Sequence, residues 1–300
     1  MHIVVLGAGA IGSVYGAKLS TAHDVTLVAR PAHADEINTH GLRITGSEEK
    51  LYRVRAVTEV VELAAGTLIV LTTKVSDSEA AIRPLVPLLT PDMTILCVQN
   101  GLYSERLVKD LVGERCLVLR AITHFGAIYG TPGVVELKVS ATTRIQDSPR
   151  SAAIADAFTR CGLDGQVTGR ITDEMWENLV VNCVINPINA MTRAEVGAIA
   201  DERLRPLKQL IVNECRQVAA RDGVDLAADF VDRIDRQYAP SRNLSSMQQD
   251  LLKGRPTEID FLNGAVVSLG RQYGVECPVN QALTMIIKAM ERRRPTPSPS

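Results

Sequence analysis

The sequence lacks several features that would assign it to particular classes of protein. Its 33 Lys and Arg residues nearly balance its 34 Asp and Glu residues, which leaves a formal net charge of −1. A balance this close to zero gives no reason to expect nucleic acid or a membrane surface as a partner. No apolar run is long enough to cross a bilayer, and the five histidines show no metal-ligand spacing. We therefore expect no membrane span, no nucleic-acid partner and no metal.

The cysteines also lack a pattern. No C-x-x-C pair occurs among Cys97, Cys116, Cys161, Cys183, Cys215 and Cys277, and most of them lie in apolar runs. Scattered cysteines in apolar surroundings predict buried, reduced thiols and a cytoplasmic protein. The N-terminus agrees, because residues 1–12 read as the first strand and turn of a folded domain rather than as a signal peptide.

The most informative motif of the chain is a glycine pattern close to its N-terminus. An apolar run, residues 2–6, leads directly into six residues expected to hold a cofactor: Gly7, Ala8, Gly9, Ala10, Ile11 and Gly12. A second apolar run, residues 25–29, follows. In a strand, turn, helix and strand of this kind, the first glycine permits the tight turn. The second lets backbone amides approach a pyrophosphate, and the third lets helix and strand pack closely. Glycine turns are common, but this context favours dinucleotide binding.

Arg30, at the end of the second apolar run, indicates which dinucleotide. NAD-binding domains usually carry Asp or Glu roughly 20 residues after the glycines, where the carboxylate binds the ribose 2′-hydroxyl. This chain has a guanidinium there and no acid immediately before it. A guanidinium complements a 2′-phosphate, and such a charged hydrogen bond contributes about 1.5–3 kcal/mol. The alternative is a solvated Arg at a strand end, but NADP(H) is the favoured cofactor.

The 300 residues, 46% of them hydrophobic and 22% charged, suffice for two domains with separate cores. In the first half, apolar segments such as 68–71 and 93–98 alternate with helical ones such as 78–89, which predicts a parallel, doubly wound sheet. Residues 117–128 and 134–139 flank a turn rich in Gly and Pro and predict an antiparallel hairpin at the far edge of that sheet. Residues 151–161 are expected to form a closing helix.

From about residue 172 the pattern becomes wholly helical. The expected helices span residues 173–190, 201–222, 227–237, 247–253, 257–273 and 278–292. The fold class is therefore an α/β Rossmann-like N-terminal domain (1–168) followed by an all-α C-terminal domain (169–292), with the catalytic cleft expected between them. Residues 293–300, rich in Pro and Ser, cannot bury apolar surface and are expected to be disordered.

One helix in the second half carries an unusual polar stripe. Asn178, Asn182, Asn186 and Asn189 fall at i, i+4, i+8 and i+11, within an arc of about 80° on one face. The other faces are apolar, so the helix is expected to be buried, and buried amides need partners. The stripe is either an internal hydrogen-bond network or the wall of a polar ligand site. Pro187, within the same helix, is expected to kink it.

Two further segments carry residues whose spacing predicts roles in helix capping and helix stability. Ser246 with Gln249 matches a capping box, and Glu258 falls in the first turn of an expected helix, where its charge suits the helix dipole. Spacing alone therefore favours structural roles for both Ser246 and Glu258.

Taken in order, the motifs resemble the ketopantoate reductase (2-dehydropantoate 2-reductase) family. The resemblance runs from residue 1 to about residue 292 and rests on the glycine turn and on the motifs Thr73-Lys74, Gln99-Asn100-Gly101, Asn182-Cys183-Val184-Ile185-Asn186-Pro187, residues 243–250 and residues 257–264. It implies NADPH-dependent reduction of the ketone of 2-dehydropantoate to (R)-pantoate, for pantothenate synthesis.

The resemblance also implies roles for matching residues. Lys74 and Asn100 would lie near the nicotinamide end of the cofactor, with Asn100 also near the substrate. Glu258 would bind the substrate's hydroxyl group, hold the ketone in place and lie against the cofactor. The residues expected to contact substrate are Asn182, Asn186, Asn243 and Ser246. This favours the ligand-site interpretation of the polar stripe.

The chain departs from the family at one catalytic position. The family carries Lys in the W-x-K-L segment as the proposed general acid, whereas this chain reads Trp176-Glu177-Asn178-Leu179. An amide donates a hydrogen bond but releases no proton near pH 7, and a lost general acid typically costs about 10²–10⁴ in rate. A retained donor recovers part of this loss by stabilising an oxyanion.

Three interpretations of the departure follow. The chain is an active ketopantoate reductase in which water or Lys74 supplies the proton, a reductase of another 2-keto acid, or an NADPH-binding relative with little or no catalysis. A homodimer through the helical domain is a further expectation without a patch in the sequence to locate it.

Overall fold

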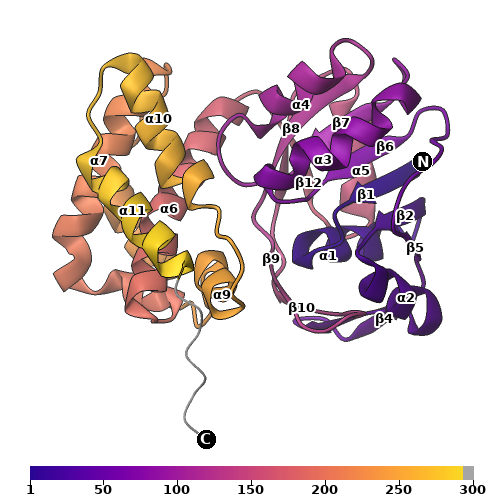
Figure 1. Cartoon of the computed structure of the whole chain (residues 1–300), viewed down its shortest axis with the longest axis horizontal. Helices are drawn as coiled ribbons and strands as arrows, with labels where there is room; N and C mark the ends of the chain where they lie inside the picture. Colours follow the sequence, from indigo (N-terminus) through magenta and orange to yellow (C-terminus); the bar gives the residue numbers. More distant parts are fainter. Residues whose placement is uncertain (293–300) are drawn as a thin grey trace, which may run out of the picture. The chain divides into compact units, whose positions relative to one another are not determined.

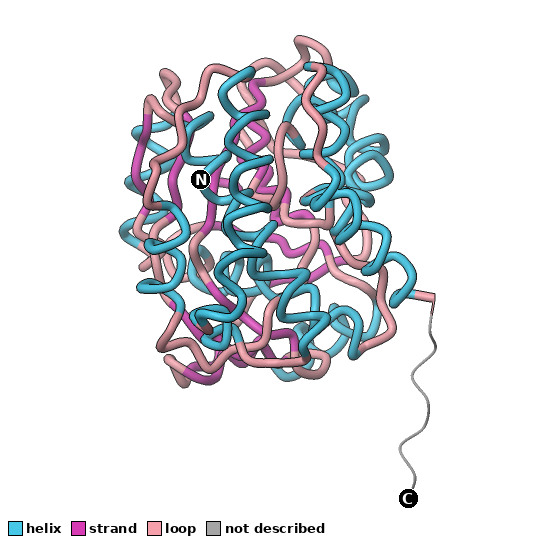
Figure 2. Tube along the Cα trace, turned by 90° about the vertical axis from the view of Figure 1, so that its left-hand side faces the viewer, coloured by secondary structure: helices cyan, strands magenta, loops and turns pink. Residues whose placement is uncertain are grey.

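The computed structural model describes residues 1–292, so the expected disorder of residues 293–300 lies outside the described residues. The chain divides into two compact units, Met1–Ile171 and a second unit that begins at Thr172. All strands belong to the first unit, and the described part of the second contains helices and loops only, as the labels of Figure 1 show. Figure 2 colours the helices cyan and the strands magenta along the chain.

An eight-stranded sheet organises the first unit, in the order β12-β11-β8-β7-β6-β1-β2-β5. The strands are β1 (His2–Leu6), β2 (Asp24–Val28), β5 (Arg55–Val57), β6 (Leu68–Leu71), β7 (Thr94–Cys97), β8 (Leu117–Thr123), β11 (Thr143–Gln146) and β12 (Gly165–Thr168). From β5 to β8 all neighbours are parallel, whereas β11 pairs antiparallel with β8. The chain moves to one side of β1 to form β2 and β5, and to the other side for β6. This puts the topological switch point, where doubly wound sheets bind their ligands, at the carboxyl ends of β1 and β6.

Alternation along β1 explains why both faces of the sheet are covered. Ile3 and Val5 join the core shared with helices α1 (Ala10–Leu19), α2 (Pro31–His40) and α5 (Ser151–Arg160). Val4 and Leu6 join the opposite core, with α3 (Ser78–Ile82), the 3-10 helix η2 (Arg83–Leu88) and α4 (Ser104–Val112). Successive residues of a strand point to opposite faces, so a strand buried on both faces is apolar throughout.

The predicted edge hairpin is wrong in its placement. Residues 117–128 do not form one strand: β8 ends at Thr123, and β9 (Gly126–Tyr129) pairs antiparallel with β10 (Val134–Val139) in a separate four-stranded sheet. The other strands of that sheet, β3 (Leu42–Gly46) and β4 (Lys50–Tyr52), come from a polar segment for which no strand was predicted. The edge that the hairpin was expected to occupy is formed by β11 and β12.

The second unit is helical, as predicted, with differences at the helix ends. Its helices are α6 (Ile171–Thr192), α7 (Arg205–Arg221), α8 (Phe230–Tyr238), α9 (Ser246–Leu252), α10 (Asn263–Tyr273) and α11 (Pro278–Glu291), joined in part by the 3-10 helices η3 (Val196–Ala200), η4 (Glu202–Leu204) and η5 (Ile259–Phe261). The expected helix over 201–222 begins only at Arg205, because Pro206 suits a first turn. The expected helix over 257–273 is two elements, η5 and α10.

Within residues 1–292 no helix is both long and apolar enough to span a membrane. All six cysteines are free and buried, as their surroundings predicted. Burial raises the pKa of Cys97 to about 12 and that of Cys116 to about 11, so these thiols stay protonated and unreactive.

Candidate functional site

The glycine turn lies at the switch point of the sheet and packs against the end of β6. Gly7 adopts φ +104°, and a Cβ there would lie 2.7 Å from the Thr73 side chain. A Cβ on Gly12 would lie 2.3 Å from the Gly7 carbonyl oxygen and 2.5 Å from Thr72 Oγ1. Thr72 Oγ1 in turn donates to that carbonyl at 2.9 Å. Gly7 and Gly12 are therefore required by the local packing.

Gly9 differs from its two neighbours because open space surrounds it. A Cβ at Gly9 would meet no atom within 4 Å. Gly9 is the N-cap of α1, and no side chain caps that helix. Helices leave their first amides without helical partners, and those amides with the helix dipole favour an anion. The absence of a side chain at Gly9 is thus not explained by packing, and the arrangement fits a dinucleotide pyrophosphate over the turn.

Arg30 lies at the carboxyl end of β2, close in the fold to the glycine turn. The amides of Gly7 and Ala8 donate to the carbonyl of Val28, at 3.2 and 2.8 Å. Arg30 follows Val28 by two residues, is exposed, and is the N-cap of α2. This is the edge of the sheet where an adenosine ribose lies in doubly wound dinucleotide-binding domains. An exposed guanidinium here is available to an added phosphate.

His33, three residues after Arg30 on α2, is buried and forms hydrogen bonds with α1 and with the β9–β10 turn. Gly133 N donates to His33 Nδ1 at 2.9 Å, so Nδ1 carries no proton, and Nε2 donates to Ser13 Oγ at 3.1 Å. His33 is 3% exposed. Burial, with a smaller contribution from the charge of Arg30, lowers the pKa of His33 to about 4. His33 is therefore neutral at pH 7 and ties α2 to α1 and to the β9–β10 turn.

Lys74 and Asn100 follow the neighbouring strands β6 and β7 at the same edge of the sheet. Both are partly buried, and Lys74 is the N-cap of the 3-10 helix η1 (Val75–Asp77). Gln99 Nε2 links their loops by donating to the Thr73 carbonyl at 2.9 Å and to Ser78 Oγ at 2.7 Å. The parallel strands therefore bring the glycine turn, Lys74 and Asn100 to the same edge, where the carboxyl ends of the strands lie.

In the second unit, three of the four stripe residues form a chain of amides along α6. Asn186 Nδ2 donates to Asn182 Oδ1 at 3.0 Å, and Asn182 Nδ2 donates to Asn178 Oδ1 at 3.0 Å and to the Asn178 carbonyl at 2.8 Å. All three amides point the same way, so the chain ends in the NH₂ group of Asn178. Asn178 and Asn182 are partly exposed, whereas Asn186 is buried. Hydrogen bonds aligned in this way polarise one another and strengthen the terminal donor.

Asn189 does not continue the chain. It is 1% exposed and donates to the carbonyls of Ala194 and Glu195, at 3.3 and 2.8 Å. Of the two interpretations of the stripe, Asn189 therefore follows the structural one. Asn178 and Asn182 fit both the hydrogen-bond network and the ligand-site interpretation, because they bind each other and are also partly exposed.

The proline in α6 is accommodated by a partner from another helix. α6 runs through Pro187, which has no N–H to donate to the carbonyl of Cys183. Asn263 Nδ2 donates to that carbonyl at 3.0 Å and to Asn280 Oδ1 at 2.9 Å, and Asn263 is fully buried. Asn280 Nδ2 donates to Glu214 at 2.7 Å. Sequence reasoning assigned no role to Asn263, although it lies within the 257–264 motif.

Asn243, Ser246 and Glu258 lie on loops and helix starts of the second unit. Ser246 is exposed, and the capping assignment was wrong by one residue, because Ser245 caps α9 by accepting from Gln248 N at 3.3 Å. Ser246 therefore does not have the helix-capping role that its spacing predicted. Glu258 is partly buried and precedes the three-residue η5, so it is not in the first turn of an α-helix as expected.

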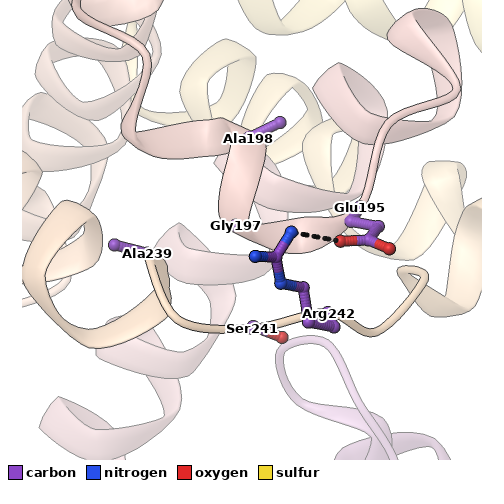
Figure 3. Close-up of a pocket in the computed structure, with 6 residues that line it drawn as sticks. All are labelled: Glu195, Gly197, Ala198, Ala239, Ser241 and Arg242. Atoms are coloured by element: carbon purple, nitrogen blue, oxygen red, sulfur yellow. Dashed lines mark hydrogen bonds and ion pairs between the residues drawn. The ribbon is translucent and has the colours of Figure 1, made fainter.

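A cavity of about 370 Å³ lies in the second unit (Figure 3). Its lining includes Arg242, the residue immediately before Asn243. Arg242 crosses it to pair with Glu195 at 3.4 Å, and both side chains are well exposed. The other lining residues are Gly197, Ala198, Ala239 and Ser241. The amides of Val196 and Gly197 donate to the carbonyls of Asn243 and Ser241, each at 2.8 Å, which fixes the Asn243 backbone. None of the residues predicted from sequence lines this cavity.

No group of three or more His, Cys, Asp or Glu side chains within residues 1–292 is arranged to hold a metal. Sequence reasoning assigned no role to two buried polar residues, Gln99 and Arg120, which hydrogen-bond to the loops that follow β6 and β7. Gln99 stands beside Asn100 in a motif already singled out, whereas Arg120 lies in an apolar strand and gives no signal.

Each unit matches a family model. Residues 3–150 match the model described as ketopantoate reductase PanE/ApbA, and residues 170–291 match the one described as its C-terminal part. A 2-dehydropantoate 2-reductase of Pyrococcus horikoshii is 33% identical over 299 residues, which cover 97% of this chain and 98% of that protein. The chain belongs to the ketopantoate reductase family. This confirms the resemblance read from the motifs and places the chain among oxidoreductases.

Further members and relatives agree with the ketopantoate reductase fold. A 2-dehydropantoate 2-reductase of Vibrio cholerae is 31% identical, over 97% of this chain and 98% of its own. The solved structure of a PanE/ApbA family ketopantoate reductase from Ralstonia eutropha matches with a TM-score of 0.90 at 29% identity, covering 97% of this chain and 98% of that one. These matches confirm the Rossmann-like first unit and the helical second unit.

One structural relative of this ketopantoate reductase family member carries a different name. D-mandelate dehydrogenase, solved with NADH and anilino(oxo)acetate, matches with a TM-score of 0.89 at 28% identity, covering 97% of this chain and 98% of its own. The same architecture therefore serves a relative whose structure holds NADH.

Proposed function

We propose that this protein uses NADPH to reduce the ketone of a 2-keto acid, with 2-dehydropantoate as substrate and (R)-pantoate as product. The observation that carries the proposal is the amide chain on α6, which ends in the donor group of Asn178 at the position where the family has its proposed acid. Family membership supplies the reaction class, and the chain of amides supplies a group suited to the oxygen on which charge develops.

The choice of NADPH over NADH rests on Arg30. The guanidinium is exposed at the carboxyl end of β2, and no carboxylate precedes it to bind a ribose 2′-hydroxyl. The glycine turn and the uncapped start of α1 would hold the pyrophosphate, and Lys74 and Asn100 would lie toward the nicotinamide. Bound NADPH supplies the hydride.

The residues of the second unit would bind and orient the keto acid. Asn178 would donate to the developing alkoxide without releasing a proton, so water or Lys74 would supply the proton. Asn182, which is partly exposed, would contact substrate, together with Asn243 and the exposed hydroxyl of Ser246, which does not cap α9. Asn186, buried and donating to Asn182, is better placed to orient Asn182 than to contact substrate.

Glu258 would bind the substrate's hydroxyl group and hold the ketone against the cofactor. We expect a cytoplasmic enzyme, since all six cysteines are free and buried. A homodimer remains a proposal that a sedimentation experiment tests directly.

A second candidate is reduction of a different 2-keto acid. The structural match to D-mandelate dehydrogenase, with a TM-score of 0.89 against 0.90 for a ketopantoate reductase, favours it. NADPH oxidation with purified protein and a panel of 2-keto acids that includes 2-dehydropantoate and benzoylformate separates the two. Turnover of 2-dehydropantoate alone supports the first function, and turnover of another acid supports the second. NADPH binding without turnover of any acid would overturn both.

The cofactor assignment has its own variant. Arg30→Ala should remove an NADPH preference of roughly 10- to 150-fold, because one charged hydrogen bond to the 2′-phosphate is lost. Dissociation constants for NADPH and NADH, measured by fluorescence for the natural protein and the variant, check this. Equal affinities for both cofactors in the natural protein would remove the assignment of Arg30.

A further inference from the structure

A buried guanidinium supports the loop that follows β7. Arg120 lies on β8, directly opposite Cys97 of β7, and is 2% exposed. Its Nη2 donates to the carbonyls of Gln99 and Gly101, the latter at 2.9 Å, and its Nη1 donates to Ser104 Oγ. Burying a guanidinium is costly unless its donors are used, so Arg120 requires this loop in this shape.

The contacts of Arg120 bracket Asn100. The two carbonyls belong to the residues on either side of Asn100, and Ser104 begins α4. The loop between them needs such support, because Gly101 has φ +85° and Tyr103 has φ +57°. A side chain in the left-handed region persists only where surrounding contacts hold it.

The support extends to the neighbouring loop through Gln99. The Gln99 carbonyl accepts from Arg120, while its side chain donates to Thr73, the residue before Lys74, and to Ser78. Ser78 is fully buried and Gln99 is 4% exposed. One hydrogen-bonded chain thus joins the loops after β6 and β7 to the middle of β8, and it passes beside both residues expected at the nicotinamide end.

We propose that Arg120 is a positioning residue that holds Asn100, and through Gln99 also Lys74, in the shape that the nicotinamide half of the cofactor requires. The inference rests on the proposed function for the roles of Asn100 and Lys74. Lysine does not replace arginine here, because one ammonium nitrogen cannot span two carbonyls and a hydroxyl in the way a planar guanidinium does.

The test compares the whole cofactor with its adenosine half. Calorimetry measures the affinities of Arg120→Lys and Arg120→Met for NADPH and for adenosine 2′,5′-bisphosphate, which lacks the nicotinamide half. Both variants should lose about tenfold or more in NADPH affinity, as expected for lost charged hydrogen bonds, and keep the affinity for the bisphosphate. Equal losses for the two ligands, or no loss for either, would overturn the inference.

A matched control exists at the other end of β7. Arg150 donates to the carbonyls of Met93 and Pro91, each at 2.7 Å, which precede the strand. Arg150→Met breaks a guanidinium clamp of the same kind at the edge remote from the glycine turn, so it should leave the ratio of the two affinities unchanged. A changed ratio in Arg150→Met would show that any lost clamp has this effect, and would overturn the inference.

A milder variant covers the case in which both Arg120 variants fail to fold. Ser104→Ala removes one acceptor of Arg120 and should weaken NADPH binding severalfold with the bisphosphate affinity unchanged; an unchanged NADPH affinity counts against the inference. If the natural protein binds neither ligand, the proposed function itself fails. If it binds both and the ratio stays constant in every variant, only the role of Arg120 fails.

Discussion

The two units hold their polar candidate residues by different means. At the strand ends of the first unit, a buried cation, Arg120, and a buried titratable group, His33, bind atoms of the loops. On α6 of the second unit, neutral amides bind one another, and Asn263 binds a carbonyl that Pro187 leaves without a helical donor.

The difference follows from the elements themselves. Loops after parallel strands expose several carbonyls that need donors, and one guanidinium supplies up to five in a fixed geometry. A helix satisfies nearly all of its own backbone, so its side chains are left to pair with each other. The first arrangement carries a titratable group that acid can charge, whereas the chain of Asn178, Asn182 and Asn186 on α6 has none. Three changes test this contrast.

Acid should act on the first unit through His33. The unfolded chain protonates this residue below pH 6.5, whereas the folded protein, with a pKa of about 4, does not. Between these values the unfolded state binds more protons, so stability is full above pH 6.5 and falls by up to about 3 kcal/mol toward pH 4. Urea unfolding at a series of pH values measures this loss.

The control for His33 lies on the same helix. His33→Asn should flatten the dependence between pH 6.5 and 4, whereas Asn38→Ala, which removes no titratable group, should leave its slope as in the natural protein. The same slope in all three proteins would show that His33 is not the group responsible.

The second change breaks the amide network of the helical unit. Asn263→Ala should cost about 1–3 kcal/mol of unfolding free energy, because the Cys183 carbonyl and the Asn280 side chain lose a buried donor. Thermal or urea unfolding measures the loss. Asn38→Ala, which also removes an amide bonded to backbone but at an exposed residue, should cost less. The reverse order would mean that the carbonyl beside Pro187 needs no partner.

The third and smallest change places a charge in the neutral chain. Asn178→Lys should raise turnover of 2-dehydropantoate by about tenfold or more, since a positioned acid contributes at least that much. Asn178→Ala, the matched variant without a donor, should lower turnover. Steady-state rates at saturating NADPH decide the matter, and an unchanged or lower rate in Asn178→Lys would place the acid elsewhere or point to another substrate.

The sequence predicted most strongly what depends on local pattern. The glycine turn with its flanking strands, the helical second half and the stripe on α6 all have short, regular signals. The second sheet was missed because β3 contributes only Leu42 and Ile44 to the core, too short an alternation to stand out in a polar segment. Its partner, the β9–β10 hairpin, was recognised as a hairpin and assigned to the wrong sheet, since pairing between distant strands leaves no local trace.

The candidate site shows the same division. The positions of the asparagines were predictable from helical periodicity, but the direction of their amides and the separate role of Asn189 depend on contacts with other turns and loops. Arg120 was not predictable, because an arginine inside an apolar strand gives no sign of which carbonyls it will bind. Ser245 rather than Ser246 forms the cap, a shift of one residue that only backbone conformation decides.

Pro187 makes α6 depend on a distant helix for its own integrity. Any residue other than proline at this position would bring its own N–H to the Cys183 carbonyl, which would then have a helical donor and depend less on Asn263. The proline and its carboxamide partner are therefore coupled, and a redesign of this interior should treat the two positions together.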